Sequence, residues 1–257
     1  MMVFSYIALV IIGLITGGIT SLVGASAVTL IVPALTILFH TNPHIAIGTS
    51  LFVDIITSII VAYNYHKQGH VRLKSGLWMA IAAVVGAQIG SLWANQMHGG
   101  TLSGLFGILM IYSGISGLRK KNSNSKHKEV QFPSKWMQIG CEILIGIGIG
   151  IMSGIFGAGG GVMILMALVY ILHYPMHIAV GTSTLIMAIT ACSSDLGYMM
   201  HGNIDFIYGS ILAIGAVIGG FIGSKYANKI NDASLAKFLN WFFIIIGLVM
   251  LVQPLFK

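Results

Sequence analysis

The residues best suited to chemistry in this chain form a run of small residues that could bind an anion through its backbone. The run is Gly157-Ala158-Gly159-Gly160-Gly161, and it joins two apolar segments. Glycine lets a backbone approach a ligand closely, and the N–H groups at the start of a helix attract negative charge. We therefore predict an anion site at this run, with close helix packing through small residues as the alternative. The shorter stretch Gly24-Ala25-Ser26 is its counterpart earlier in the chain.

Hydroxyl side chains follow both stretches, in the blocks His-Ile-Ala-Ile-Gly-Thr-Ser at 44–50 and His-Ile-Ala-Val-Gly-Thr-Ser at 177–183. Hydroxyls at the start of a helix cap the helix or bind a ligand oxygen, and both roles stay open. Thr57 and Thr190 lie two turns further along and would continue a polar lining. The substrate-binding candidates in these segments are Gly48, Thr49, Ser50, Thr57, Gly181, Thr182, Ser183 and Thr190.

Two histidines, His44 and His177, stand just before these hydroxyl residues and are weaker candidates for the same site. A histidine in a membrane-interface loop is more often an ordinary hydrogen-bonding residue than a ligand or a proton relay. We therefore keep both roles open for this pair.

Asp54 is the exceptional residue, because it lies near the middle of an apolar segment, 45–65. A carboxylate inside a membrane is a functional-site hypothesis by default, and insertion scales put its cost at roughly 2.5–3.5 kcal/mol. All Lys and Arg residues lie in loops or at the C-terminus. A proton, a bound cation or hydrogen bonds from neighbouring hydroxyls must therefore satisfy this side chain. It is the leading candidate for an ion-coupling group, and a hydrogen-bonded structural role is the alternative.

The candidate residues belong to a pattern that occurs twice. Gly48 and Gly181 are equivalent (181 − 48 = 133), and this offset holds without a gap over roughly a hundred residues. Each copy contains five apolar segments. In the first copy they are 3–23, 27–39, 45–65, 75–97 and 102–118, and in the second they are 139–156, 162–172, 178–200, 207–226 and 235–252.

The second segment of each copy is short for a full membrane crossing. A helix needs about 20 residues to cross the hydrocarbon, and Pro33 also interrupts this segment in the first copy. Either all five segments span the membrane, or the first two form a re-entrant hairpin. We favour short or broken helices at the glycine-rich joint, because irregular backbone at membrane depth is tolerated where protein buries it.

The composition identifies the class of protein. Of 257 residues, 56% are hydrophobic and only 7% are charged, whereas soluble domains carry about 25% charged residues. This indicates an all-α, polytopic membrane protein. The two cysteines, Cys141 and Cys192, lie in apolar segments and fit no metal-ligand spacing. We expect neither a metal nor a cofactor.

The distribution of basic residues predicts how the two copies are oriented. The net charge is +7, but all Lys and Arg residues except the C-terminal one lie in three inter-helix segments, which argues for membrane orientation and against nucleic acid. The loop 66–74 is basic and its equivalent 201–205 has no Lys or Arg, while 96–101 has none and its equivalent 225–237 is basic. Matching loops are therefore expected on opposite sides of the membrane, which makes the repeats inverted.

The predicted organisation is that of a secondary transporter. The repeats occupy 1–118 and 138–257, and a basic cytoplasmic linker, 119–137, joins them. Inverted repeats with discontinuous helices are the common plan of secondary transporters, whose substrate site lies near the midplane. The sequence has no nucleophile elbow, no paired His-x-x-x-His and no Walker-type phosphate loop. We expect a non-enzymatic transporter, and the alternative is an intramembrane enzyme or an accessory structural subunit.

In these motifs and their order, the chain resembles the sulfite exporter TauE/SafE family over nearly its whole length. The resemblance rests on the turn 154–161, the two blocks ending in Gly-Thr-Ser, and His-Gly-Asn-Ile-Asp at 201–205, with Gly69-His70-Val71-Arg72 as a weaker first copy. It implies a permease for a small sulfur-containing or organic anion such as sulfite, thiosulfate or a sulfonate. The expected partners are that anion and the lipid bilayer. The first copy departs from the family pattern in its incomplete glycine run and in Asp54.

Overall fold

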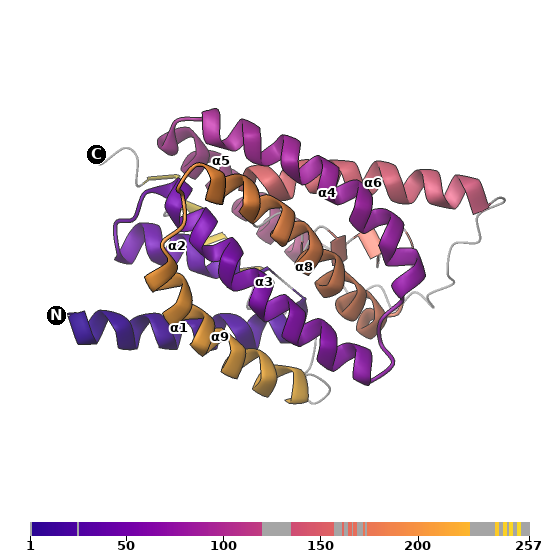
Figure 1. Ribbon diagram of the computed structural model, residues 1–257, viewed down its shortest axis with the longest axis horizontal. Helices are drawn as coiled ribbons and strands as arrows, with labels where there is room; N and C mark the ends of the chain where they lie inside the picture. Colours follow the sequence, from indigo (N-terminus) through magenta and orange to yellow (C-terminus); the bar gives the residue numbers. More distant parts are fainter. Residues whose placement is uncertain are drawn as a thin grey trace.

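In the computed structural model, the chain forms a bundle of long α-helices packed side by side (Figure 1). The structure describes residues 2–24, 26–119, 135–156, 161, 164–165, 167–168, 172, 174–226, 240–241, 244–245, 247–248 and 251–252. Every regular element in these ranges is a helix, which confirms the predicted all-α class. The rest of the chain, including most of the predicted linker 119–137, lies outside the described residues.

The helix bounds follow the apolar segments of the sequence closely. They are α1 Met2–Val23, α2 Val28–Leu38, α3 Pro43–Lys67, α4 Leu73–Gln96, α5 Gly99–Arg119, α6 Lys135–Phe156, α8 Met176–Met200 and α9 Phe206–Tyr226. Of the helices that the structure describes, α1, α3, α4, α8 and α9 contain stretches long and apolar enough to cross a membrane. Large apolar side chains such as Trp78 and Phe221 are exposed on the outside of the bundle, as a lipid-facing surface requires.

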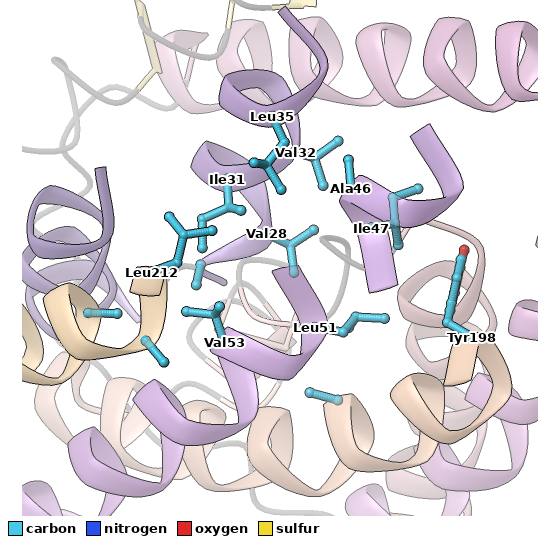
Figure 2. Close-up of a cluster of buried hydrophobic side chains, with 14 of the residues drawn as sticks. Val28, Ile31, Val32, Leu35, Ala46, Ile47, Leu51, Val53, Tyr198 and Leu212 are labelled. Atoms are coloured by element: carbon cyan, nitrogen blue, oxygen red, sulfur yellow. The ribbon is translucent and has the colours of Figure 1, made fainter. Parts of the chain in front are cut away.

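Helix α2 is the short element that the sequence predicts. Its 11 residues rise about 16 Å, roughly half of a 30 Å hydrocarbon core. Figure 2 shows its side chains Val28, Ile31, Val32 and Leu35 pointing into a buried apolar cluster with residues of α3, α8 and α9. A half-length helix is thus embedded in protein. Most of the equivalent segment of the second copy, 162–172, lies outside the described residues.

Residues that are 133 positions apart are equivalent in the structure as well as in the sequence. Helices α1 and α6 begin and end at equivalent residues, and so do α3 and α8. Contacts recur in the same way. The Tyr65 hydroxyl donates to the Ser21 carbonyl at 3.1 Å, and the equivalent Tyr198 hydroxyl lies 3.4 Å from the Gly154 carbonyl. The two copies therefore share one packing scheme.

Equivalent helices run in opposite directions along the bundle. In Figure 1, α1, α3 and α9 run from left to right, whereas their equivalents α6, α8 and α4 run from right to left. The basic ends of α3, α4, α6 and α9 all lie toward the right-hand end. The inverted-repeat prediction requires this arrangement, and the sidedness in a membrane stays a prediction.

Two helix pairs pack through small residues at close range. A Cβ atom at Gly17 of α1 would stand 2.8 Å from the Ala216 Cα of α9, and one at the equivalent Gly150 of α6 would stand 2.8 Å from the Ala83 Cα of α4. Real Cβ contacts with backbone are not this short, so a side chain would push the helices apart. Small residues that let backbones approach drive helix association in membranes.

This packing predicts a sharp difference between two neighbouring glycines. We expect Gly17→Ala to lower the melting temperature of the detergent-solubilised protein, because its methyl group would collide with the α9 backbone. Gly18→Ala is the matched control, since a Cβ there would come no closer than 3.9 Å to the Gly219 carbonyl and alanine favours helix. Equal melting temperatures for the two variants would contradict the α1–α9 packing.

Candidate functional site

The centre of the candidate site is the carboxylate of Asp54, which caps the N-terminus of α2. Its Oδ2 atom accepts a hydrogen bond from the Ser26 hydroxyl at 2.7 Å, and its Oδ1 atom accepts one from the Ala27 N–H at 2.8 Å. The Asp54 side chain is only 1% exposed. An acceptor with negative charge is what the first N–H groups of a helix need. The sequence leaves open whether a proton, a bound cation or hydrogen bonds satisfy Asp54. The structure shows the hydrogen bonds.

The chain reaches this cap through a turn that only glycine makes without strain. Gly24 has a φ of +68°, in the left-handed region. A Cβ atom on Gly24 would stand 3.2 Å from the Ser183 Oγ atom of α8. The turn before α2 in the first copy is thus packed against the Gly-Thr-Ser block of the second copy.

Gly161, the last residue of the small-residue stretch of the second copy, meets the same turn. A Cβ atom at Gly161 would stand 2.8 Å from the Ser26 N atom and 3.0 Å from the Gly24 carbonyl oxygen. It would also collide with the Sδ atom of Met187, the residue equivalent to Asp54. The structure therefore brings Gly24, Ser26 and Gly161 together beside Asp54.

The threonines of the two Gly-Thr-Ser blocks hold loops of the opposite copy. The Thr49 Oγ1 atom accepts from the Asp205 N–H at 2.8 Å, and the equivalent Thr182 Oγ1 atom accepts from the Arg72 N–H at 3.1 Å. Both threonine side chains are fully buried. These two contacts join the helices to loops at opposite ends of the bundle.

The glycines of the same blocks are close-packing residues. A Cβ atom on Gly48 would collide with the Asn203 carbonyl, and one on Gly181 with the His70 carbonyl. Gly48 and Gly181 therefore serve close packing, which was the alternative to anion binding. Gly24 and Gly161 instead lie beside the buried Asp54 carboxylate.

The remaining hydroxyls are buried but bonded within their own helices. Each donates to a carbonyl three or four residues earlier: Ser50 to Ile47 at 2.7 Å, Thr57 to Val53 at 2.9 Å, Ser183 to Val180 at 2.9 Å, and Thr190 to Ile186 at 3.1 Å. A hydroxyl has one donor, so donation to an anion would require these groups to rotate away from their carbonyls.

The two candidate histidines lie at opposite ends of the bundle, and neither has a recorded contact with Asp54. The His44 Nε2 atom is 3.0 Å from the Met97 carbonyl oxygen. The exposed His177 side chain lies beside His70, with the ring centroids 5.5 Å apart. The structure therefore does not bring His44 and His177 to Asp54.

Some predicted residues, Ala25, Gly157, Ala158, Gly159 and Gly160, lie outside the described residues, so the glycine run itself stays a prediction. Among the described residues, no group of three His, Cys, Asp or Glu side chains could hold a metal ion. Sequence reasoning did not single out Asp195, which is buried, or the loop residues His70 and Arg72. The loop 69–72 recurs at the repeat offset as 202–205. This recurrence was the signal in the sequence that could have indicated His70 and Arg72.

Comparisons with known proteins agree with this picture. A family model described as "Sulfite exporter TauE/SafE" matches residues 9–250. The "Probable membrane transporter protein YunE" of Bacillus subtilis is 30% identical over 98% of this chain and 100% of its own length. A "Probable membrane transporter protein" of Methanocaldococcus jannaschii is 29% identical over 95% of this chain and 94% of its own length. No solved structure matches the chain at a significant level.

The cap predicts the stability of Asp54 variants. Asp54→Ala would leave the Ser26 hydroxyl and the Ala27 N–H buried without their acceptor, and we expect a loss of about 1–3 kcal/mol. Asp54→Asn keeps one acceptor oxygen and should lose less. Denaturation of the purified protein measures both losses. In a double-mutant cycle, Ser26→Ala and Asp54→Ala should be non-additive, because each removes the same hydrogen bond. Additive losses would argue against the cap.

Proposed function

Because the chain belongs to the sulfite exporter TauE/SafE family, we propose that it is a secondary transporter for a small sulfur-containing or organic anion, such as sulfite, thiosulfate or a sulfonate. The observation that carries this proposal is the meeting of Gly24 and Ser26 of the first copy with Gly161 of the second, at the start of a half-length helix. Substrate sites of secondary transporters lie at such repeat interfaces, beside broken helices. The helix lengths and the family support a multi-pass protein of the cytoplasmic membrane.

We expect the anion to bind to residues of the second copy where Gly161 meets the turn before α2. The first backbone donor of α2, the Ala27 N–H, and the Ser26 hydroxyl already donate to Asp54. A substrate anion would have to displace this tethered carboxylate to use them. Gly161, where the predicted glycine run ends, lies against the same turn without a side chain of its own. We therefore assign the run 157–161 the larger share of anion binding.

Inverted repeats give this protein two equivalent gates. The Thr49–Asp205 contact closes one end, and the Thr182–Arg72 contact closes the other. Both contacts are formed in this structure, and each joins one copy to a loop of the other. We propose that transport opens them alternately, since exchanging the roles of two equivalent halves is how inverted repeats alternate access.

Asp54 is our candidate for coupling the α2 cap to an ion. A proton on this carboxyl would turn one oxygen from an acceptor into a donor: on Oδ2 it would reverse the Ser26 bond, and on Oδ1 it would remove the acceptor of the Ala27 N–H. Protonation would also remove the negative charge that a helix N-terminus favours, and would thus loosen the start of α2. The alternative is that Asp54 only stabilises the fold. An enzymatic role is not favoured, because the family and the names of the relatives indicate transport.

Anion flux tests the proposed function and its site together. We expect proteoliposomes containing the wild-type chain to transport at least one anion from a panel of sulfite, thiosulfate, taurine, sulfoacetate and small carboxylates. Gly161→Leu should abolish this flux, because its side chain would collide with Met187 and the α2 turn. Gly140→Leu is the matched control, since a Cβ there meets nothing within 4 Å. Wild-type liposomes that carry none of these anions would contradict the proposal.

Cysteine accessibility tests the inverted orientation. Gln68 and His201 are equivalent, exposed loop residues of the two copies. In a background lacking Cys141 and Cys192, we expect Gln68→Cys to react with an impermeant maleimide from the cytoplasmic side and His201→Cys from the opposite side. Reaction of both from one side would rule out inverted repeats.

A further inference from the structure

We infer that His70, Arg72 and His177 form an anion-loading site at the basic end of the bundle, next to the Thr182 gate. This inference rests on the proposed transport function and adds a binding site to it. The site would take the transported anion itself, a small oxyanion, before that anion reaches the α2 cap.

The two histidines come from different copies, and their rings lie side by side. His70 lies in the loop between α3 and α4, and His177 lies in the first turn of α8, with ring centroids 5.5 Å apart. The His70 Nδ1 atom is buried and has no hydrogen-bond partner among the described residues. Buried polar atoms are normally paired, so an unpaired imidazole nitrogen beside an exposed imidazole indicates a place for a ligand.

Arg72 brings a permanent positive charge to the residues that precede α8. Its guanidinium carbon lies 4.8 Å from the ring centroid of Tyr174, which directly precedes the α8 N-cap residue Pro175. Its backbone N–H bonds Thr182 in the second turn of α8. The arginine is therefore fixed at two points beside the start of α8. A guanidinium is the side chain best suited to bind an oxyanion through paired N–H groups.

The start of α8 adds to this positive field. Its N-cap residue is Pro175, whose side chain cannot accept a hydrogen bond. The equivalent N-cap residue of α3 is Asn42, whose Oδ1 atom accepts from the His44 N–H at 3.0 Å. The N-terminus of α8, a helix of 25 residues, is thus not neutralised by its own cap, and a helix N-terminus favours an anion.

The opposite end of the bundle provides an internal comparison. Asn203 stands where His70 stands, and Asp205 stands where Arg72 stands. The backbone is alike at both ends, because His70 N and Asn203 N each bond the carbonyl of an equivalent tyrosine at 3.0 Å. At that end the Asp205 Oδ1 atom accepts from the Ile207 and Tyr208 N–H groups at 3.0 Å. A guanidinium at one end thus corresponds to a carboxylate at the other, so only the basic end attracts an anion.

The contacts continue from this site to the α2 cap. Thr182 bonds the Arg72 backbone, and its neighbour Ser183 lies against Gly24 at the turn before α2. The loading site is therefore connected to the residues that surround Asp54 through Thr182 and Ser183. This placement suits capture of the anion from the basic end.

Transport from each side of the membrane tests the site. Inverted vesicles expose the basic end to the medium if the positive-inside rule holds, and right-side-out vesicles expose the other end. With radiolabelled sulfite as the probe, Arg72→Gln should raise the half-saturation concentration about tenfold or more in inverted vesicles, as expected when a charged hydrogen-bond donor is lost. In right-side-out vesicles it should change little.

Lys67→Gln is the matched control, because it removes one positive charge from the same end. The Lys67 Nζ atom lies 4.6 Å above the exposed Tyr63 ring, outside the proposed site. His70→Asn is a second variant that the backbone should tolerate, since asparagine occupies the equivalent position 203. It should also raise half-saturation in inverted vesicles alone.

Each outcome decides between the hypotheses. Equal effects of Arg72→Gln and Lys67→Gln would show a general surface potential and overturn the site. Equal effects on both vesicle types would overturn loading from the basic end. If Arg72→Gln fails to insert in the membrane, an unchanged half-saturation in His70→Asn would overturn the site by itself. If the wild type carries no sulfite, but carries another anion of the panel, the same comparison is made with that anion. Absence of all flux would refute the transport function and the loading site with it.

Discussion

The structure depends on one constraint, which is that a helix beginning inside a lipid-embedded bundle must find acceptors for its first N–H groups. Helix α2 begins in such a place, where Ser26, Ala27 and Val28 are buried. The Asp54 carboxylate supplies the acceptors for Ala27 N–H and the Ser26 hydroxyl. This interaction ties the start of α2 to α3, next to the Gly24 turn.

Around this cap, the close helix packing and several hydrogen bonds obey the repeat symmetry, whereas some charged side chains break it. A Cβ atom added at Gly17 or at the equivalent Gly150 would stand at the same distance, 2.8 Å, from the Cα atom of Ala216 or Ala83. The two distances agree because close helix packing leaves little room for variation. The charged residues are among those that differ. Asp54 corresponds to Met187, and Arg72 corresponds to Asp205. In the proposed transport cycle, the symmetric packing would allow two equivalent conformations, and the asymmetric charges would give the two ends different affinities for an anion.

The glycines of the chain serve two different purposes that spacing does not distinguish. Gly48 and Gly181 let a helix touch a loop carbonyl of the other copy, so the hydroxyls beside them anchor that loop. Gly24 and Gly161 instead border the buried carboxylate. The motifs that resemble one another in sequence thus divide into residues that anchor a loop of the other copy and residues that border Asp54.

The sequence by itself determined the helical class, the helix ends, the short second segment and the repeat offset, because hydrophobic length and composition act locally along the chain. It also indicated that Asp54 needs a partner inside the membrane. Only the tertiary structure decided that this partner is Ser26 and Ala27, rather than any of the other buried hydroxyls. The pairing of His70 with His177 was equally beyond the sequence. Such partners lie far apart in the chain, and which ones meet depends on how the helices pack, which residue spacing does not encode.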